Sequence, residues 1–176
     1  MKHSAELRKL LRAALFTAMT CAATLVIQIP MPGTNGYVNI GDCFVLLGAW
    51  VLGPLYGAFA GGVGSALADL LSGYAYYVPA TLLIKAAMAV LAAMLSAALH
   101  RHCKLHFSRL LGGIAAELWM VGGYFGYACL LLGEGLTAAV SIPGNLFQGA
   151  VGIVGATALA AALHGAKAMT GGIQNG

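Results

Sequence analysis

Six apolar runs, separated by short polar, glycine- or proline-containing segments, occupy most of this sequence. Hydrophobic residues make up 60% of the chain and charged residues only 8%, whereas a soluble domain carries roughly 25% charged residues. Too few charged side chains remain to cover the surface of a water-soluble fold. The pattern therefore predicts an all-α integral membrane protein.

The lengths of the runs predict where the helices lie, because a helix needs about 20 apolar residues to cross the hydrocarbon core. A single helix over 41–73 would be about 50 Å long, too long for a bilayer. Gly53-Pro54 is the natural break, since proline disfavours helical backbone in the residue before it. One six-helix membrane domain over residues 1–176 is expected, with helices at 10–29, 40–53, 55–73, 79–99, 110–132 and 143–164.

Basic residues predict how this bundle is oriented. With six spans and both termini in the cytoplasm, every lysine and arginine except Lys85 falls on the cytoplasmic side, as membrane proteins prefer. The longer loops assigned outside, 30–40 and 133–142, contain neither residue type. The net charge of +4 therefore reports topology and gives no support to nucleic-acid binding.

Polar side chains set among the apolar runs mark a candidate binding site. Ionisable groups at membrane depth cost about 2.5–3.5 kcal/mol each and usually face a cavity or a partner. Under the predicted topology most of them gather near the outer end of the bundle, where they would suit a small-molecule pocket with apolar and aromatic walls. The candidate residues are Asn39, Asp42, Tyr74, Tyr77, Lys85, Glu117, Tyr124, Asn145 and Gln148.

Several of these residues also have a purely structural interpretation. Asp42 or Asn145 could cap its helix, and the tyrosines could form an interfacial aromatic belt. Asp69 and Lys85 could form an ion pair between neighbouring helices. Glu117 would either reach the floor of the pocket or brace a helix interface.

Nothing in the sequence predicts catalysis or a metal site. There is no GxxxxGK[ST] phosphate loop and no GxSxG or HExxH motif, so we expect no enzyme activity, no catalytic cofactor and no ATPase. The histidines and Cys103 in the loop 100–106 match no common zinc spacing. A disulfide between Cys43 and Cys129 stays open as an alternative to buried free thiols.

Five segments carry a family resemblance: YVNIGD, GPLYGAFAGGVGSALADLLSGY, YYVPATLLIK, GGIAAELWMVGGYF and SIPGNLFQGAVG. Together with the six-helix pattern, over about residues 8–165, they resemble the substrate-binding S component of energy-coupling factor (ECF) vitamin transporters. The closest resemblance is to the group that contains the hydroxymethylpyrimidine and vitamin B6 types.

This resemblance implies a subunit of the bacterial plasma membrane that captures a vitamin or vitamin precursor outside and delivers it inward. A transmembrane coupling subunit and two cytosolic ATPases would supply the energy. Ala14, Ala18 and Ala22 on the first helix would dock on the coupling subunit, and the loop 30–40 would cover the ligand.

The substrate and one alternative function stay open. Aromatic stacking and hydrogen-bonding side chains suit a vitamin B6 vitamer or hydroxymethylpyrimidine, but also a riboflavin-like molecule or a deazapurine nucleoside. The alternative function is an autonomous ion-coupled carrier or channel, with Asp69, Lys85 and Glu117 as a relay.

Overall fold

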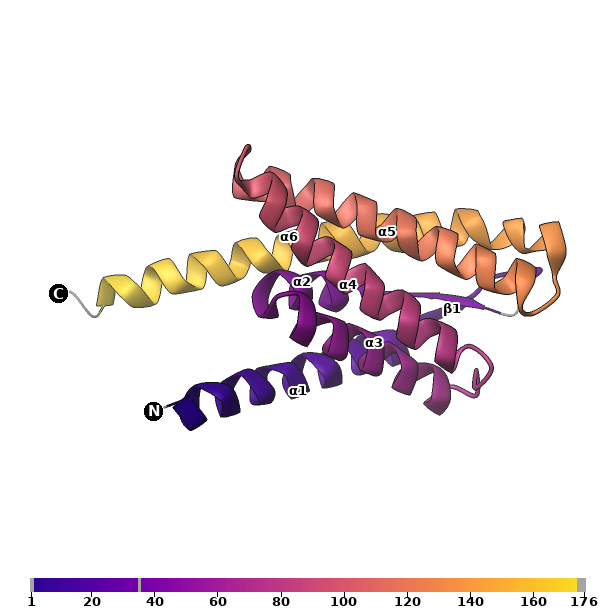
Figure 1. Ribbon diagram of the computed structural model, residues 1–176, viewed down its shortest axis with the longest axis horizontal. Helices are drawn as coiled ribbons and strands as arrows, with labels where there is room; N and C mark the ends of the chain where they lie inside the picture. Colours follow the sequence, from indigo (N-terminus) through magenta and orange to yellow (C-terminus); the bar gives the residue numbers. More distant parts are fainter. Residues whose placement is uncertain (1, 35, 174–176) are drawn as a thin grey trace.

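The computed structural model describes residues 2–34 and 36–173, with side chains described for 4–34 and 36–164. Within these residues it contains the six expected α-helices, and a 3-10 helix, η1 (Gly135–Val140), precedes the last of them. The start of the first helix and the end of the last helix lie at the same end of the bundle (Figure 1). The helices are α1 (Lys2–Val26), α2 (Asp42–Leu52), α3 (Pro54–Leu71), α4 (Val78–His100), α5 (Leu105–Leu130) and α6 (Ser141–Ile173).

Three segments in the described chain are long and apolar enough to cross a membrane: Ser4–Val26, Val78–His100 and Gly135–His164. By contrast, α2 has 11 residues, so it is roughly 16 Å long and covers about half of a ~30 Å hydrocarbon core. Helix α2 is therefore too short to cross the hydrocarbon core by itself, and it derives from the shortest of the six apolar runs in the sequence.

The break between α2 and α3 falls at Gly53-Pro54, as the sequence predicts. Gly53 has φ 81° and ψ −178°, a conformation that is essentially restricted to glycine. Pro54 begins α3, where its missing N–H costs no hydrogen bond. The two helices then pack closely, because a Cβ atom on Gly57 would lie 2.8 Å from the Cα atom of Ala49. The small-residue face at Gly57 and Gly61 therefore packs inside the protein.

The substitution Gly57→Val should lower the free energy of unfolding by about 1–3 kcal/mol, the usual cost of overpacking. The reason is the contact of Gly57 with the backbone of α2. Gly122→Val on α5 is the matched control, because a Cβ atom there meets nothing within 4 Å. Thermal unfolding in detergent measures both variants, and equal shifts would contradict the close approach of α3 to α2.

Between α1 and α2 the chain forms a short hairpin that the sequence analysis does not predict. Strand β1 (Gln28–Pro30) pairs antiparallel with β2 (Tyr37–Asn39), with Ile29 opposite Val38. Strands of three residues are too short for alternation to stand out in a sequence. The hairpin lies toward the end of the bundle opposite to the start of α1 (Figure 1).

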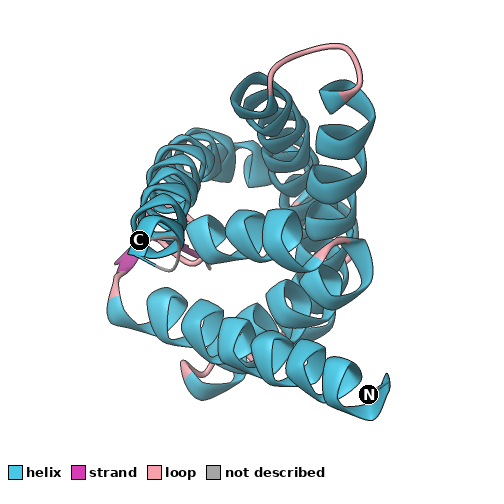
Figure 2. Ribbon diagram, turned by 90° about the vertical axis from the view of Figure 1, so that its left-hand side faces the viewer, coloured by secondary structure: helices cyan, strands magenta, loops and turns pink. Residues whose placement is uncertain are grey.

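The interior is organised around α2 and α4. The helix α4 packs between α3 and α5, while α2 contacts α1, α3, α4 and α6. Figure 2 looks onto the bundle from the end at which α1 begins. Every residue of α2 from 42 to 49 except Phe44 is buried. This enclosure places Asp42, the first residue of α2, in the interior of the bundle.

Candidate functional site

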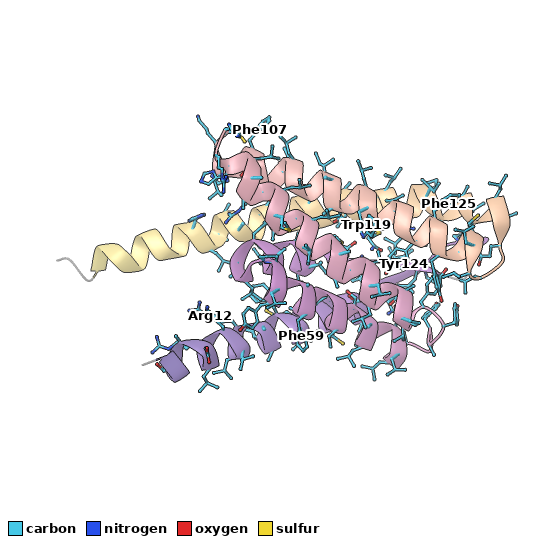
Figure 3. All side chains as sticks on the ribbon, in the orientation of Figure 1. Arg12, Phe59, Phe107, Trp119, Tyr124 and Phe125 are labelled. Atoms are coloured by element: carbon cyan, nitrogen blue, oxygen red, sulfur yellow. The ribbon has the colours of Figure 1, made fainter. Side chains whose placement is uncertain are left out.

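A cavity of about 50 Å³ lies beneath the hairpin, at the end of the bundle opposite to the start of α1. The hairpin, α3, α4, α5 and α6 all contribute side chains to its wall. Five of the predicted site residues line it: Asn39, Tyr77, Tyr124, Asn145 and Gln148. Tyr124 of α5 is labelled in Figure 3. The structure thus brings together residues from 39 to 148 that the sequence analysis assigned to one site.

Asn145 and Gln148 lie one helical turn apart in α6 and both face the cavity, as their spacing predicts. Asn145 is only 4% exposed, and its side chain makes no hydrogen bond to any other described side chain or backbone group. It is the fifth residue of α6, so the alternative that Asn145 caps the helix is wrong. Its amide remains free to donate to and accept from a ligand.

Lys85 and Asp42 do not line the cavity but form an ion pair beside it. Both side chains are nearly inaccessible, at 2% and 1% exposure. Lys85 Nζ also lies 5.5 Å from the ring centroid of Tyr124, which does line the cavity. We therefore assign the pair a structural position one side chain away from the cavity.

Two alternatives for these charged residues are wrong. Lys85 pairs with Asp42, whereas Asp69 accepts a hydrogen bond of 2.6 Å from the hydroxyl of Tyr37. Asp69 and Lys85 do not pair because they lie at different depths in the bundle: Asp69 is near the end of α3, whereas Lys85 is two turns inside α4. Asp42 is not a helix cap either, since Gly41 occupies the cap position of α2.

Gln148 joins the hairpin to the ion pair. Its Oε1 accepts hydrogen bonds from the backbone N–H of Asn39 at 2.8 Å and from Asn39 Nδ2 at 3.2 Å. Its Nε2 donates to Asp42 Oδ2 at 2.7 Å. Buried polar groups are costly unless hydrogen-bonded, so this amide holds three segments in one satisfied network.

The tyrosines form a chain of neighbouring rings along the cavity rather than a dispersed belt. Tyr74 does not line the cavity, but its ring packs 4.8 Å from that of Tyr37, centroid to centroid. The ring centroid of Tyr77 lies 6.1 Å from that of Tyr124. Burial raises the pKa of Tyr77 to about 12. The pKa of Tyr37 is also raised, mainly by burial and to a lesser extent by the nearby charge of Asp69. Both phenols are therefore neutral hydrogen-bond donors at physiological pH.

Glu117 lies at the interface between α5 and α6, outside the cavity wall. It is 4% exposed, and neither carboxylate oxygen has a hydrogen-bond partner in the described chain. A Cβ atom on Gly152 would lie 2.7 Å from Glu117 Oε1, and one on Gly149 would lie 3.0 Å from Glu117 Cβ. Of the two predicted positions for Glu117, the structure supports the helix interface.

The sequence analysis missed several lining residues. Met31, Thr81, Glu134 and Ser141 line the cavity and were not candidates. Glu134 is the only charged residue in the predicted outer loop 133–142, and this isolated charge could have marked it as a candidate site residue. Buried hydroxyl groups such as those of Thr81 and Ser141 gave none, because such residues are common at helix interfaces in membranes.

Neither a disulfide nor a metal site accompanies this cavity in the described structure. All four cysteines are free, so the Cys43–Cys129 alternative is wrong. Among the described residues no three histidine, cysteine or acidic side chains gather as metal ligands would.

Ala14, Ala18 and Ala22, predicted as a docking surface, lie exposed on α1. They line an open groove of about 490 Å³ between α1 and α3. Phe59 of α3, labelled in Figure 3, also lines this groove. In the described structure these three alanines are therefore not covered by other parts of the chain.

Comparison with known proteins identifies relatives over most of the chain. A sequence model of the family described as "ECF-type riboflavin transporter, S component" matches residues 4–165. An uncharacterized protein from the gap 3′ region of Pyrococcus woesei is 38% identical over 131 residues, covering 74% of this chain and 84% of that protein. The thiamine precursor transporter HmpT of Lactococcus lactis subsp. cremoris is 29% identical over 150 residues, covering 85% and 83%.

The fold agrees with these matches. The S component of a bacterial ECF transporter superposes with a TM-score of 0.70, covering 91% of this chain and 97% of that one, at 18% identity. Identity this low supports the fold alone, whereas the family match extends over nearly the whole chain. The chain therefore belongs to the S-component family of ECF-type transporters.

Proposed function

We propose that this S component binds a single-ring vitamin precursor or vitamin, a hydroxymethylpyrimidine or a vitamin B6 vitamer, in the cavity beneath the hairpin. The observation that carries the proposal is the amide of Asn145, which faces the cavity with no partner in the described chain. An amide both donates and accepts, as ring nitrogens and hydroxyl groups of such a ligand require. The neighbouring tyrosine rings supply the aromatic surface for stacking.

Cavity size supports a one-ring ligand over a larger one. The family description names riboflavin, a three-ring molecule, whereas the relative HmpT is a thiamine precursor transporter. A cavity of about 50 Å³ between packed tyrosine rings suits the smaller heterocycle with modest opening of the hairpin. A riboflavin-like ligand or a deazapurine nucleoside would need a much larger displacement.

The proposed transport cycle needs partners. S components of this family work with a transmembrane component and ATPases. We propose that the cavity end faces outward in a bacterial plasma membrane and that both termini are cytoplasmic, as the basic residues favour. The chain itself contributes capture and release of the ligand.

Binding to a panel of vitamins and precursors tests the substrate. Purified protein without ATP should bind hydroxymethylpyrimidine or pyridoxine more tightly than riboflavin in calorimetric titration. Asn145→Ala should weaken binding by roughly tenfold, the equivalent of about 1.4 kcal/mol, because ligand hydrogen bonds are lost. Gly126→Ala is the control, since a Cβ atom there meets nothing within 4 Å. Preference for riboflavin, or no sub-micromolar ligand at all, would overturn the substrate assignment.

Transport by the chain alone would overturn the wider proposal. The carrier alternative needs a relay through Asp69, Lys85 and Glu117, yet no hydrogen bond or ion pair joins any two of them in the described structure. Liposomes containing only this chain should therefore show no uptake driven by an ion gradient.

The alanine face of α1 should be required for assembly with the coupling subunit. Ala18→Trp would fill the groove between α1 and α3, so we expect co-purification with the coupling subunit to fall at least tenfold while ligand affinity is unchanged. Leu118→Trp, at an exposed apolar position of α5, is the control for an added indole. Unchanged co-purification of the Ala18 variant would contradict this assignment.

A further inference from the structure

A second and larger cavity, of about 580 Å³, lies at the end of the bundle where α1 begins, away from the hairpin. Side chains of α1, α2, α5 and α6 line it, so we call it the terminal cleft. It shares no lining residue with the cavity beneath the hairpin. Ligand binding at the other end of the protein therefore leaves this cleft unexplained.

The terminal cleft has a basic mouth. Arg12 of α1, Arg109 of α5 and His164 of α6 all line it. No acidic side chain does, and the described ion pair between Lys85 and Asp42 lies elsewhere. Arg109 packs over the ring of Trp50, with its Cζ 5.6 Å from the ring centroid. The two guanidinium groups therefore have no carboxylate partner among the described residues.

The rest of the cleft is apolar and runs inward from these charges. On α1 the lining continues from Arg12 through Phe16 to Met19, a distance of about 10 Å along the helix. On α6 it continues from His164 to Leu159. Charge at the mouth and hydrocarbon further inside is the arrangement of a phospholipid, with its headgroup at the membrane surface and its acyl chains in the bilayer.

We propose that the terminal cleft binds one anionic phospholipid. Its phosphate would interact with Arg12 and Arg109, since guanidinium groups bind phosphate oxygens in a fork geometry. An acyl chain would lie along the apolar wall, which includes the exposed leucines Leu15 and Leu163. Two unpaired cations with no nearby anion favour a negatively charged headgroup over a zwitterionic one.

Quenching of Trp50 fluorescence by brominated lipid tests the site directly. The chain contains two tryptophans, and Trp119→Phe leaves Trp50, which lines the cleft, as the sole reporter. The full chain is reconstituted in phosphatidylcholine vesicles that contain either brominated phosphatidylglycerol or brominated phosphatidylcholine. Half-maximal quenching should need about tenfold less brominated phosphatidylglycerol than brominated phosphatidylcholine, because each arginine near a membrane surface adds to the attraction of an anionic lipid.

Two variants separate the cleft from general surface charge. Arg12→Gln/Arg109→Gln should bring the ratio of the two quenching midpoints close to one. Arg101→Gln/Lys104→Gln, in the loop between α4 and α5, removes the same charge outside the cleft and should leave the tenfold ratio intact. Within each variant the ratio of the two lipids cancels any direct effect of Arg109 on Trp50 emission.

Filling the cleft provides a test that leaves its charge unchanged. Ala160→Leu adds bulk to the apolar wall and should abolish the preference, with thermal unfolding used to verify the fold. Equal quenching of the unsubstituted reporter by both lipids would overturn the proposal. So would loss of the preference to the same degree in the Arg101/Lys104 variant, because that result indicates surface attraction alone.

Discussion

Replacing Lys85 with methionine should lower the free energy of unfolding by about 3–5 kcal/mol, the usual cost of removing one partner from a buried ion pair. Asp42, at 0% exposure, would lose the cation with which it pairs in the described structure. A change of this size corresponds to a fall of roughly 6–20 °C in the midpoint of thermal unfolding for a chain of this length. Methionine keeps most of the packing volume, so the charge accounts for the loss.

The double variant Asp42→Asn/Lys85→Met should recover most of this stability. It removes both charges of the pair, and the asparagine oxygen can still accept a hydrogen bond from Gln148, whose Nε2 lies 2.7 Å from Asp42 Oδ2. Removal of a whole buried pair is often nearly neutral. Lys104→Met, at an exposed loop position, is the control. A double variant no more stable than the single one would contradict the ion pair as the cause.

Gln148→Leu should weaken ligand binding by roughly 100-fold, about 2.8 kcal/mol, and also destabilise the fold by about 2–4 kcal/mol. The amide makes three hydrogen bonds, two to Asn39 and one to Asp42. Its loss leaves a buried N–H and a buried carboxylate oxygen unsatisfied, and each such group costs about 1–3 kcal/mol or more. The hairpin over the cavity would lose its anchor to α6.

Asn145→Ala provides the comparison for this effect. It lies on the same face of α6 but makes no hydrogen bond within the described chain, so binding should fall without a fall in unfolding temperature. Titration and thermal unfolding of both variants measure the two effects. If Gln148→Leu weakened binding with full stability, the glutamine would be a ligand contact alone, and the anchoring role would be wrong.

Local signals predicted the six helices and five of the residues that line the cavity. Apolar runs and the Gly53-Pro54 break depend on short-range chemistry, so the six helices and the boundary between α2 and α3 could be inferred from sequence. Asn145 and Gln148 share a face because their spacing alone fixes it. The sequence placed Tyr74 and Tyr77 together because both lie near the ends of predicted helices.

The partners of the buried charges could not be inferred in the same way. Which carboxylate meets Lys85 depends on how α2 packs against α4, and no local pattern encodes that contact. Asp69 was the nearer candidate along the chain, yet Tyr37 of the unpredicted hairpin is its partner. Because β1 and β2 have only three residues each, the hairpin and its contacts could not be inferred from the sequence.

The pairing of Asp42 with Lys85 has an electrical consequence for a protein that works in an energised membrane. A lone charge moved through the membrane potential gains or loses about 2.3 kcal/mol per 100 mV. The two opposite charges lie in direct contact, so the field acts on them almost equally and in opposite senses. Any movement of this part of the bundle across the membrane would therefore involve little work by the transmembrane voltage on this pair.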